Sequence, residues 1–242
     1  MRALAGLLFV MAGVGIALRL GLWQLDRAAQ KETLQALMQS RSAASPLDEA
    51  GFVRTCCADP AALHYRRVRL RGQWLAEQSV WLENRQMNGR PGFFLVTPLR
   101  LNGRADAVLV QRGWAVRDND DRTRVPPVAS PSGTVVVDGL IAPPPARLYE
   151  FAASASGAIR QNLDVPAFAA QTGLTLVPVS ILQLEVPAGG AAPDGLLRDW
   201  PQPTVDVQKH YGYAFQWFAL GALMTGLYVW FQLVRPRLQR AG

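Results

Sequence analysis

The sequence predicts an integral membrane protein in which one transmembrane helix near each end flanks an extracytoplasmic, antiparallel β-rich α+β domain. Half of the 242 residues are hydrophobic, and the mean hydropathy of +0.07 is high for a soluble domain of this size. Apolar segments of bilayer length lie near both ends, and the hydrophobic period between them changes to two. The chain that remains outside the bilayer is long enough for one soluble core.

The first span is expected at residues 3–25, where Arg19 and Gln24 are the only strongly polar side chains. At about 1.5 Å per residue this segment is roughly 33 Å long, which matches a bilayer core of about 30 Å. It is longer than the apolar core of a signal peptide, so we expect the helix to be retained. Gly13, Ala17 and Gly21 form a stripe of small residues that allows a second helix to approach closely.

The second span is expected at residues 211–234, which contain no charged side chain, and a basic tail follows at 235–242. The positive-inside rule places a tail with Arg235, Arg237 and Arg240 in the cytoplasm, and two spans bring the N-terminus to the same side. We therefore expect a multi-pass protein of a bacterial inner membrane. Its main domain is expected in the periplasm, with both termini cytoplasmic and membrane lipid around the two spans.

The segments between the spans are assigned by their hydrophobic period. Residues 26–64 are expected as a helical extension and linker, 65–186 as the periplasmic β-rich domain, and 187–210 as a tether to the membrane. Asn88-Gly89 and Asn102-Gly103 are typical hairpin turns, and a short helix is expected at 166–172. The expected strands form a small barrel or sandwich and lie at 65–71, 79–84, 93–97, 107–114, 134–141 and 176–185.

The residue types that carry enzymatic chemistry are scarce in this sequence. It has no Gly-rich phosphate loop, no Gly-x-Ser-x-Gly motif and no His-x-x-x-His pair, so we expect no enzyme and no catalytic residues. Cys56 and Cys57 are adjacent, which excludes a long-range disulfide, and no second pair completes a metal site. The net charge of +7 lacks a basic run interleaved with aromatic residues, so we expect no nucleic-acid partner.

His210 lies at the outer end of the second span and begins a stripe on one face of the expected helix. Ala214, Trp217 and Gly221 follow it at helical spacing, and these small and flat groups allow two interpretations. The stripe can admit a planar macrocycle whose iron takes the imidazole nitrogen. Alternatively, His210 belongs to an interfacial aromatic belt and the small residues pack against the first helix.

Several motifs, in order along essentially the whole chain, resemble the surfeit locus protein 1 family of cytochrome c oxidase assembly factors. These motifs are Leu20–Arg27, Glu83–Arg85, Gly89–Gly92 with Thr97–Leu99, Arg112–Trp114, Gln161–Asp164, Gly195–Pro201 and Lys209–Phe218.

The resemblance implies a non-enzymatic assembly factor that helps haem a reach the catalytic subunit of a haem-copper oxidase. Its implied partners are that subunit and the proteins that make or deliver haem a. His210 matches a histidine that the family uses at the head of the second span, so the resemblance implies that it contacts the haem iron. The alternative is a membrane scaffold that stabilises an oxidase assembly intermediate without binding haem.

The candidate haem site combines residues of the second span with basic residues just outside the bilayer. The expected haem-binding residues are His210, Tyr213, Ala214, Trp217 and Gly221, and the expected propionate contacts are Arg198 and Lys209.

Overall fold

The computed structural model describes residues 2–118, 120–121, 123–149, 157–185, 194–200 and 206–241. The chain divides into two compact units, one made of residues 1–37 with 203–242 and the other of residues 38–202. Part of the expected tether, 187–193 and 201–205, lies outside the described residues.

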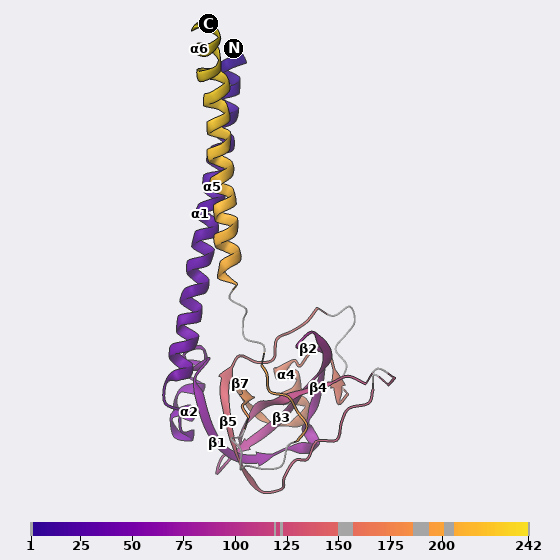
Figure 1. The fold of residues 1–242 in the computed structure, drawn as a ribbon. Coiled ribbons are helices and arrows are strands. Elements are labelled where there is room, and N and C mark those ends of the chain that lie inside the picture. The colour runs from indigo at the N-terminus through magenta and orange to yellow at the C-terminus, as the bar shows by residue number, and fades with distance from the viewer. Residues whose placement is uncertain are drawn as a thin grey trace. The chain divides into compact units, whose positions relative to one another are not determined.

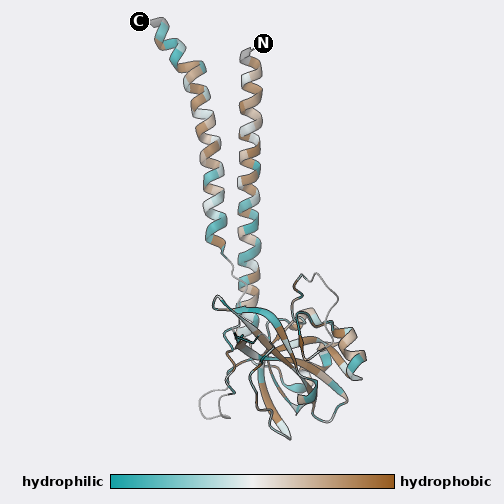
Figure 2. Cartoon of the chain, turned by 90° about the vertical axis from the view of Figure 1, so that its right-hand side faces the viewer, coloured by the Kyte–Doolittle hydropathy of each residue, from teal (hydrophilic) through white to brown (hydrophobic). Residues whose placement is uncertain are grey.

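The first unit is a pair of long helices, α1 (Arg2–Ala43) and α5 (Val207–Val229), which lie side by side and antiparallel (Figures 1 and 2). Both helices are long and apolar enough to cross a membrane. Figure 2 shows their apolar residues concentrated away from the ends that lead into the rest of the chain. Together with the β-rich unit between them in sequence, they confirm the predicted fold class.

Small residues bring the two helices together. Ala17, Gly21 and Ala28 are buried on α1, and Ala214 and Gly221 are buried on α5. A Cβ atom added at Gly21 would lie 2.6 Å from the Phe218 ring. The small-residue stripe of the first span thus packs against the second span of the same chain, as its spacing predicts.

The helical structure continues past the expected end of the second span. Residues Trp230–Val234 form one π turn, η2, and α6 (Arg235–Ala241) follows it. Pro236 has no amide hydrogen and its ring crowds the carbonyl one turn back, and a wider turn relieves that crowding. Here the Arg235 N–H donates to the Trp230 carbonyl, so the proline is accommodated without ending the helix.

The second unit is a sheet domain with short helices. Its helical elements are α2 (Glu49–Cys56), α3 (Pro60–Leu63), the 3₁₀ turn η1 (Ala76–Gln78) and α4 (Val165–Thr172). Its strands are β1 (Arg67–Trp74), β2 (Val80–Met87), β3 (Arg90–Leu101), β4 (Asp106–Val116), β5 (Thr134–Ala142), β6 (Ile159–Arg160) and β7 (Thr175–Gln183).

The strands form one mixed sheet in the order β1-β5-β7-β4-β3-β2-β6. Strand β1 also pairs with β3, and this extra pairing closes β1, β5, β7, β4 and β3 into a ring. The predicted barrel is therefore present. Outside the ring, β2 pairs with β3, and β6 pairs with β2. The sheet is not purely antiparallel, because β4 pairs with β7, and β2 with β6, in parallel.

The domain core follows from the alternation of the strands. Strand β1 alternates exposed and buried residues, so that Val68 and Leu70 point inward while Arg67 and Arg69 point to the surface. Helix α2 covers this interior with Phe52. At the hairpin between β2 and β3, Asn88 and Gly89 both have positive φ, as the Asn-Gly turn predicts.

Candidate functional site

The candidate site lies where the first turn of α5 faces α1. His210 is half-buried, and its Nδ1 atom lies 2.7 Å from Oε1 of Gln24. One residue on, the Tyr211 hydroxyl donates to Glu32 at 2.9 Å. These two contacts join polar residues of α1 and α5 at one end of the small-residue seam, where α5 begins.

The small residues of the predicted stripe contact the other helix. Ala214 and Gly221 are buried, and a Cβ atom at Gly221 would lie 3.6 Å from Ala17. Helix α1 therefore occupies the side of α5 that carries these two residues. Tyr213 is exposed and Trp217 is half-buried, and both share a helix face with His210 at spacings of three and seven.

The two expected propionate contacts belong to different units. Lys209 is exposed and forms an ion pair with Asp206 at 2.6 Å. The hydrogen bond from Lys209 lowers the pKa of the Asp206 carboxyl group. Arg198 forms an ion pair with Asp194 inside the sheet domain, where both side chains are largely buried. Both cations thus already have carboxylate partners.

The donor set fits a haem group in one respect. An imidazole whose Nδ1 is held by an amide keeps Nε2 as a nitrogen for iron, and two flat aromatic rings lie on the same helix face. Among the described residues, no group of three or more His, Cys, Asp or Glu side chains could hold a metal ion.

The motifs in the sheet domain converge on Trp114. Its indole N–H donates to the Arg85 carbonyl at 3.0 Å, and its backbone exchanges two hydrogen bonds with Leu197, at 2.7 and 2.8 Å. A Cβ atom at Gly92 would lie 2.4 Å from the indole, so only glycine allows the ring to lie there. These motif residues build the domain, and sequence spacing gave no sign that they meet.

Arg112, beside this tryptophan, holds the loop that follows β4. It is buried, donates to Ser130 at 2.6 Å and to the Ala129 carbonyl at 2.8 Å, and lies over the Trp74 ring. Burial lowers the pKa of this guanidinium, and nearby Asp194 offsets part of that effect. Its hydrogen bonds indicate a structural role.

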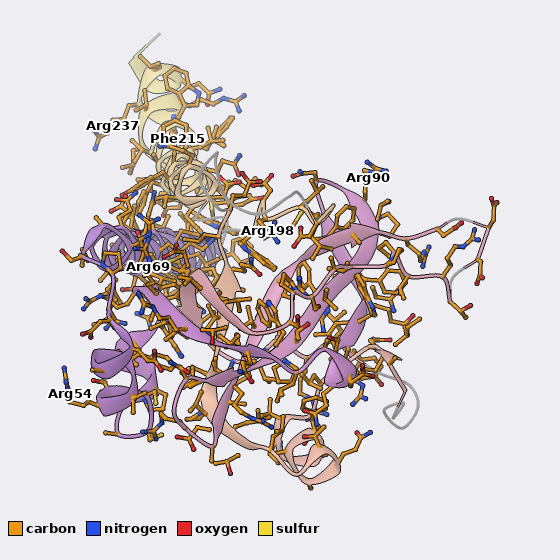
Figure 3. All side chains as sticks on the ribbon, turned by 90° about the horizontal axis from the view of Figure 1, so that it is seen from below. Arg54, Arg69, Arg90, Arg198, Phe215 and Arg237 are labelled. Atoms are coloured by element: carbon orange, nitrogen blue, oxygen red, sulfur yellow. The ribbon has the colours of Figure 1, made fainter. Side chains whose placement is uncertain are left out.

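An open groove of about 540 Å³ lies next to Trp114 in the sheet domain. Its walls include Val116, Pro126 and Leu197. Its charged residues are Arg90, Arg117, Arg124 and Asp118, which give it net positive charge. Figure 3 shows Arg90, one of these arginines, pointing away from the ribbon. Such a surface suits an apolar segment that carries carboxylates.

Comparison with known proteins assigns the chain to a family. Residues 11–222 match the SURF1 family, which is most of the chain. The chain is a member of the SURF1 family. The matched range includes the small seam residues of both α1 and α5. It also includes Gln24 and His210.

Relatives of known name support the same assignment. The chain is 33% identical to the cytochrome oxidase assembly protein SHY1 of Saccharomyces cerevisiae, over 45% of this chain and 27% of that protein. It is 25% identical to a SURF1-like protein of Drosophila melanogaster, over 90% of this chain and 74% of that protein. A SURF1-like protein of Rickettsia felis is 30% identical over 44% of this chain and 45% of its own length. The match thus spans less than half of the yeast and Rickettsia proteins.

Two features of the site were not found from the sequence. Gln24 was visible as a rare amide in an apolar span, but no pattern linked it to a histidine 186 residues away. Glu32 was equally visible and equally unassigned. The available signal for a functional role was a polar side chain within the span, in Gln24, or close after it, in Glu32.

Proposed function

We propose that this SURF1-family chain is a non-enzymatic assembly factor for a haem-copper cytochrome c oxidase, and that it assists insertion of haem a into the catalytic subunit. The family assignment and the name of the yeast relative support the assembly role. The proposed partners are the catalytic subunit and the proteins that make or deliver haem a. The proposed location is a bacterial inner membrane, with the sheet domain in the periplasm.

The haem part of the proposal rests on one observation, the imidazole of His210 held through Nδ1 at the head of α5. Haem a, when bound, supplies an iron that accepts an imidazole nitrogen. In this proposal His210 provides that nitrogen, and Tyr213 and Trp217 provide flat apolar surface beside it. Ala214 and Gly221 contribute by letting α1 pack closely enough for Gln24 to reach the ring. Lys209, in the same unit as His210, remains a proposed propionate contact.

The scaffold function is the second candidate, and the groove beside Trp114 favours it. An apolar wall with excess arginine can hold an acidic segment of an oxidase subunit without any cofactor. The two functions use different residues in different units, so variants can separate them.

Absorbance of the full-length protein, purified from a host that makes haem a, tests the haem function. The wild type should carry a Soret band, which should fall or shift in His210→Ala. His64→Ala, which changes the other histidine of the chain, should keep the band. An unchanged spectrum in His210→Ala, at normal protein abundance, would leave the scaffold function as the proposal.

Co-purification with the oxidase catalytic subunit tests the groove in the same preparations. Arg90 is exposed, so Arg90→Glu reverses a charge at the groove without disturbing the core. For the scaffold function, this variant should lose the catalytic subunit. Any Soret band that the wild type carries should be unchanged, because Arg90 is not among the proposed haem contacts. Normal recovery of the subunit would count against the groove as the binding surface.

A further inference from the structure

One side-chain hydrogen bond fixes the orientation of the His210 ring. Gln24 and His210 lie on antiparallel helices, and the small residues between them bring Gln24 Oε1 to 2.7 Å from His210 Nδ1. An amide oxygen only accepts hydrogen bonds, so Nδ1 must carry the hydrogen and donate it. The contact therefore selects one of the two neutral forms of the imidazole.

The selected form leaves the second ring nitrogen with its lone pair. A neutral imidazole has one N–H donor and one acceptor nitrogen, so a hydrogen on Nδ1 makes Nε2 the acceptor. In the part of the chain that the structure describes, Nε2 makes no hydrogen bond. Iron coordination requires this unprotonated nitrogen.

We propose that Gln24 is a positioning residue for His210, which holds the ring with Nε2 as the coordinating nitrogen. The inference rests on the proposed haem function, because the iron gives this orientation its purpose. Outer hydrogen-bond partners of this kind orient the ligand ring and raise its basicity. Gln24 thus contributes to haem affinity without contacting the haem itself.

The same helix pair supplies a matched control. The Tyr211 hydroxyl donates to Glu32, which also joins α5 to α1 but does not involve the imidazole. Tyr211→Phe removes this second bond, Gln24→Leu removes the acceptor of the first, and Gln24→Glu keeps an oxygen acceptor in its place. A merely structural role for Gln24 predicts similar effects of Tyr211→Phe and Gln24→Leu.

Nitrogen NMR of the haem-free full-length protein in detergent tests the orientation directly. Ring-nitrogen shifts distinguish the two neutral forms of histidine, and His64→Gln assigns the signals because the chain has two histidines. The wild type and Tyr211→Phe should show the hydrogen on Nδ1. In Gln24→Leu a substantial fraction should move to Nε2, and Gln24→Glu should restore the Nδ1 form. A wild-type ring with its hydrogen on Nε2, or a Gln24→Leu ring identical to wild type, overturns the inference.

Titration of the same proteins with haem a gives the second measurement. Loss of an outer partner typically weakens metal binding about 10- to 100-fold, and we expect a loss of this size in Gln24→Leu. Tyr211→Phe and Gln24→Glu should stay near the wild-type affinity. Equal affinity in Gln24→Leu and wild type overturns the inference and leaves the haem function intact. A wild type that binds no haem overturns the proposed haem function and leaves the scaffold function, while the NMR result still decides whether Gln24 orients the His210 ring.

Discussion

Cys56 and Cys57 are adjacent in the chain but lie in different environments. Cys56, the last residue of α2, packs in the core, whereas Cys57 is exposed. Both are free thiols, and their sulfur atoms lie 3.5 Å apart. Burial, with the neighbouring Cys57 as a second cause, raises the pKa of Cys56 to about 11. A buried, protonated thiol is neither a nucleophile nor a metal ligand, so its role is packing.

Alkylation with iodoacetamide at about pH 8 should therefore modify Cys57 and spare Cys56. Unfolding in detergent and urea should make both thiols reactive, and folded Cys57→Ala should show no fast-reacting thiol. Because the folded pKa is raised, Cys56 adds stability below its unfolded pKa of about 8.5. That contribution should be lost as the pH rises toward 11. Rapid modification of two thiols in the folded protein would contradict this assignment.

Local spacing identified His210, but it could not identify Gln24 as its neighbour. Residues on one helix face follow from a period of 3.6, so Tyr213, Ala214, Trp217 and Gly221 were visible together. The contact with Gln24 depends instead on the register between α1 and α5, which long-range packing determines. The same reason hid the meeting of Gly92 and Trp114 in the sheet domain.

At the scale of elements, the seam between α1 and α5 depends on glycine. Gly21 faces the Phe218 ring, whereas a Cβ atom at Gly15 would meet no other atom within 4 Å. The two glycines share one apolar helix but differ in what surrounds them. They form a matched pair for testing the packing.

Gly21→Leu should push the helices apart and lower the thermal unfolding midpoint in detergent, because overpacking costs about 1–3 kcal/mol. It should also weaken the Gln24–His210 contact, which needs the same close approach. Gly15→Leu should leave the midpoint near the wild-type value. If the two variants were equally stable, the seam would not be the contact that holds these helices together.

The sheet was predictable strand by strand but not as a whole. Period-two alternation and Asn-Gly turns located six strands, since these signals are local. The short helix expected at 166–172 is α4. Strand β6, with two residues, is too short to show a period. The parallel pairing of β4 with β7 joins distant segments, so an antiparallel arrangement of the strands was the simpler expectation.

At the scale of the molecule, the net charge of +7 overstates the charge available to a partner. Arg85, Arg112 and Arg160 are buried in the sheet domain, and burial lowers the pKa of each guanidinium. The sequence could not separate these side chains from surface arginines such as Arg54 and Arg90, which Figure 3 shows pointing outward. Part of the basic charge is therefore structural.

The orientation of the two spans rests on the arginines at their ends. Arg235, Arg237 and Arg240 follow the second span. Arg27 and Lys31 follow the first span, on the side of the sheet domain, and reduce the difference in basic charge between the two sides of the membrane. The C-terminal cluster thus decides the predicted topology, which places the sheet domain outside and the tail in the cytoplasm. A reactive thiol on each side of the membrane can test this topology.

Cys57 is a natural probe for the sheet domain, because it is exposed there while Cys56 is buried. A membrane-impermeant maleimide should label Cys57 in spheroplasts whose membrane is intact, and Cys57→Ala should abolish that label. In Cys57→Ala with Gln239→Cys, the tail thiol should react only after the membrane is permeabilised. Labelling of the tail but not of Cys57 in intact spheroplasts would reverse the topology. It would also show that Arg27 and Lys31, rather than the C-terminal arginines, set the orientation.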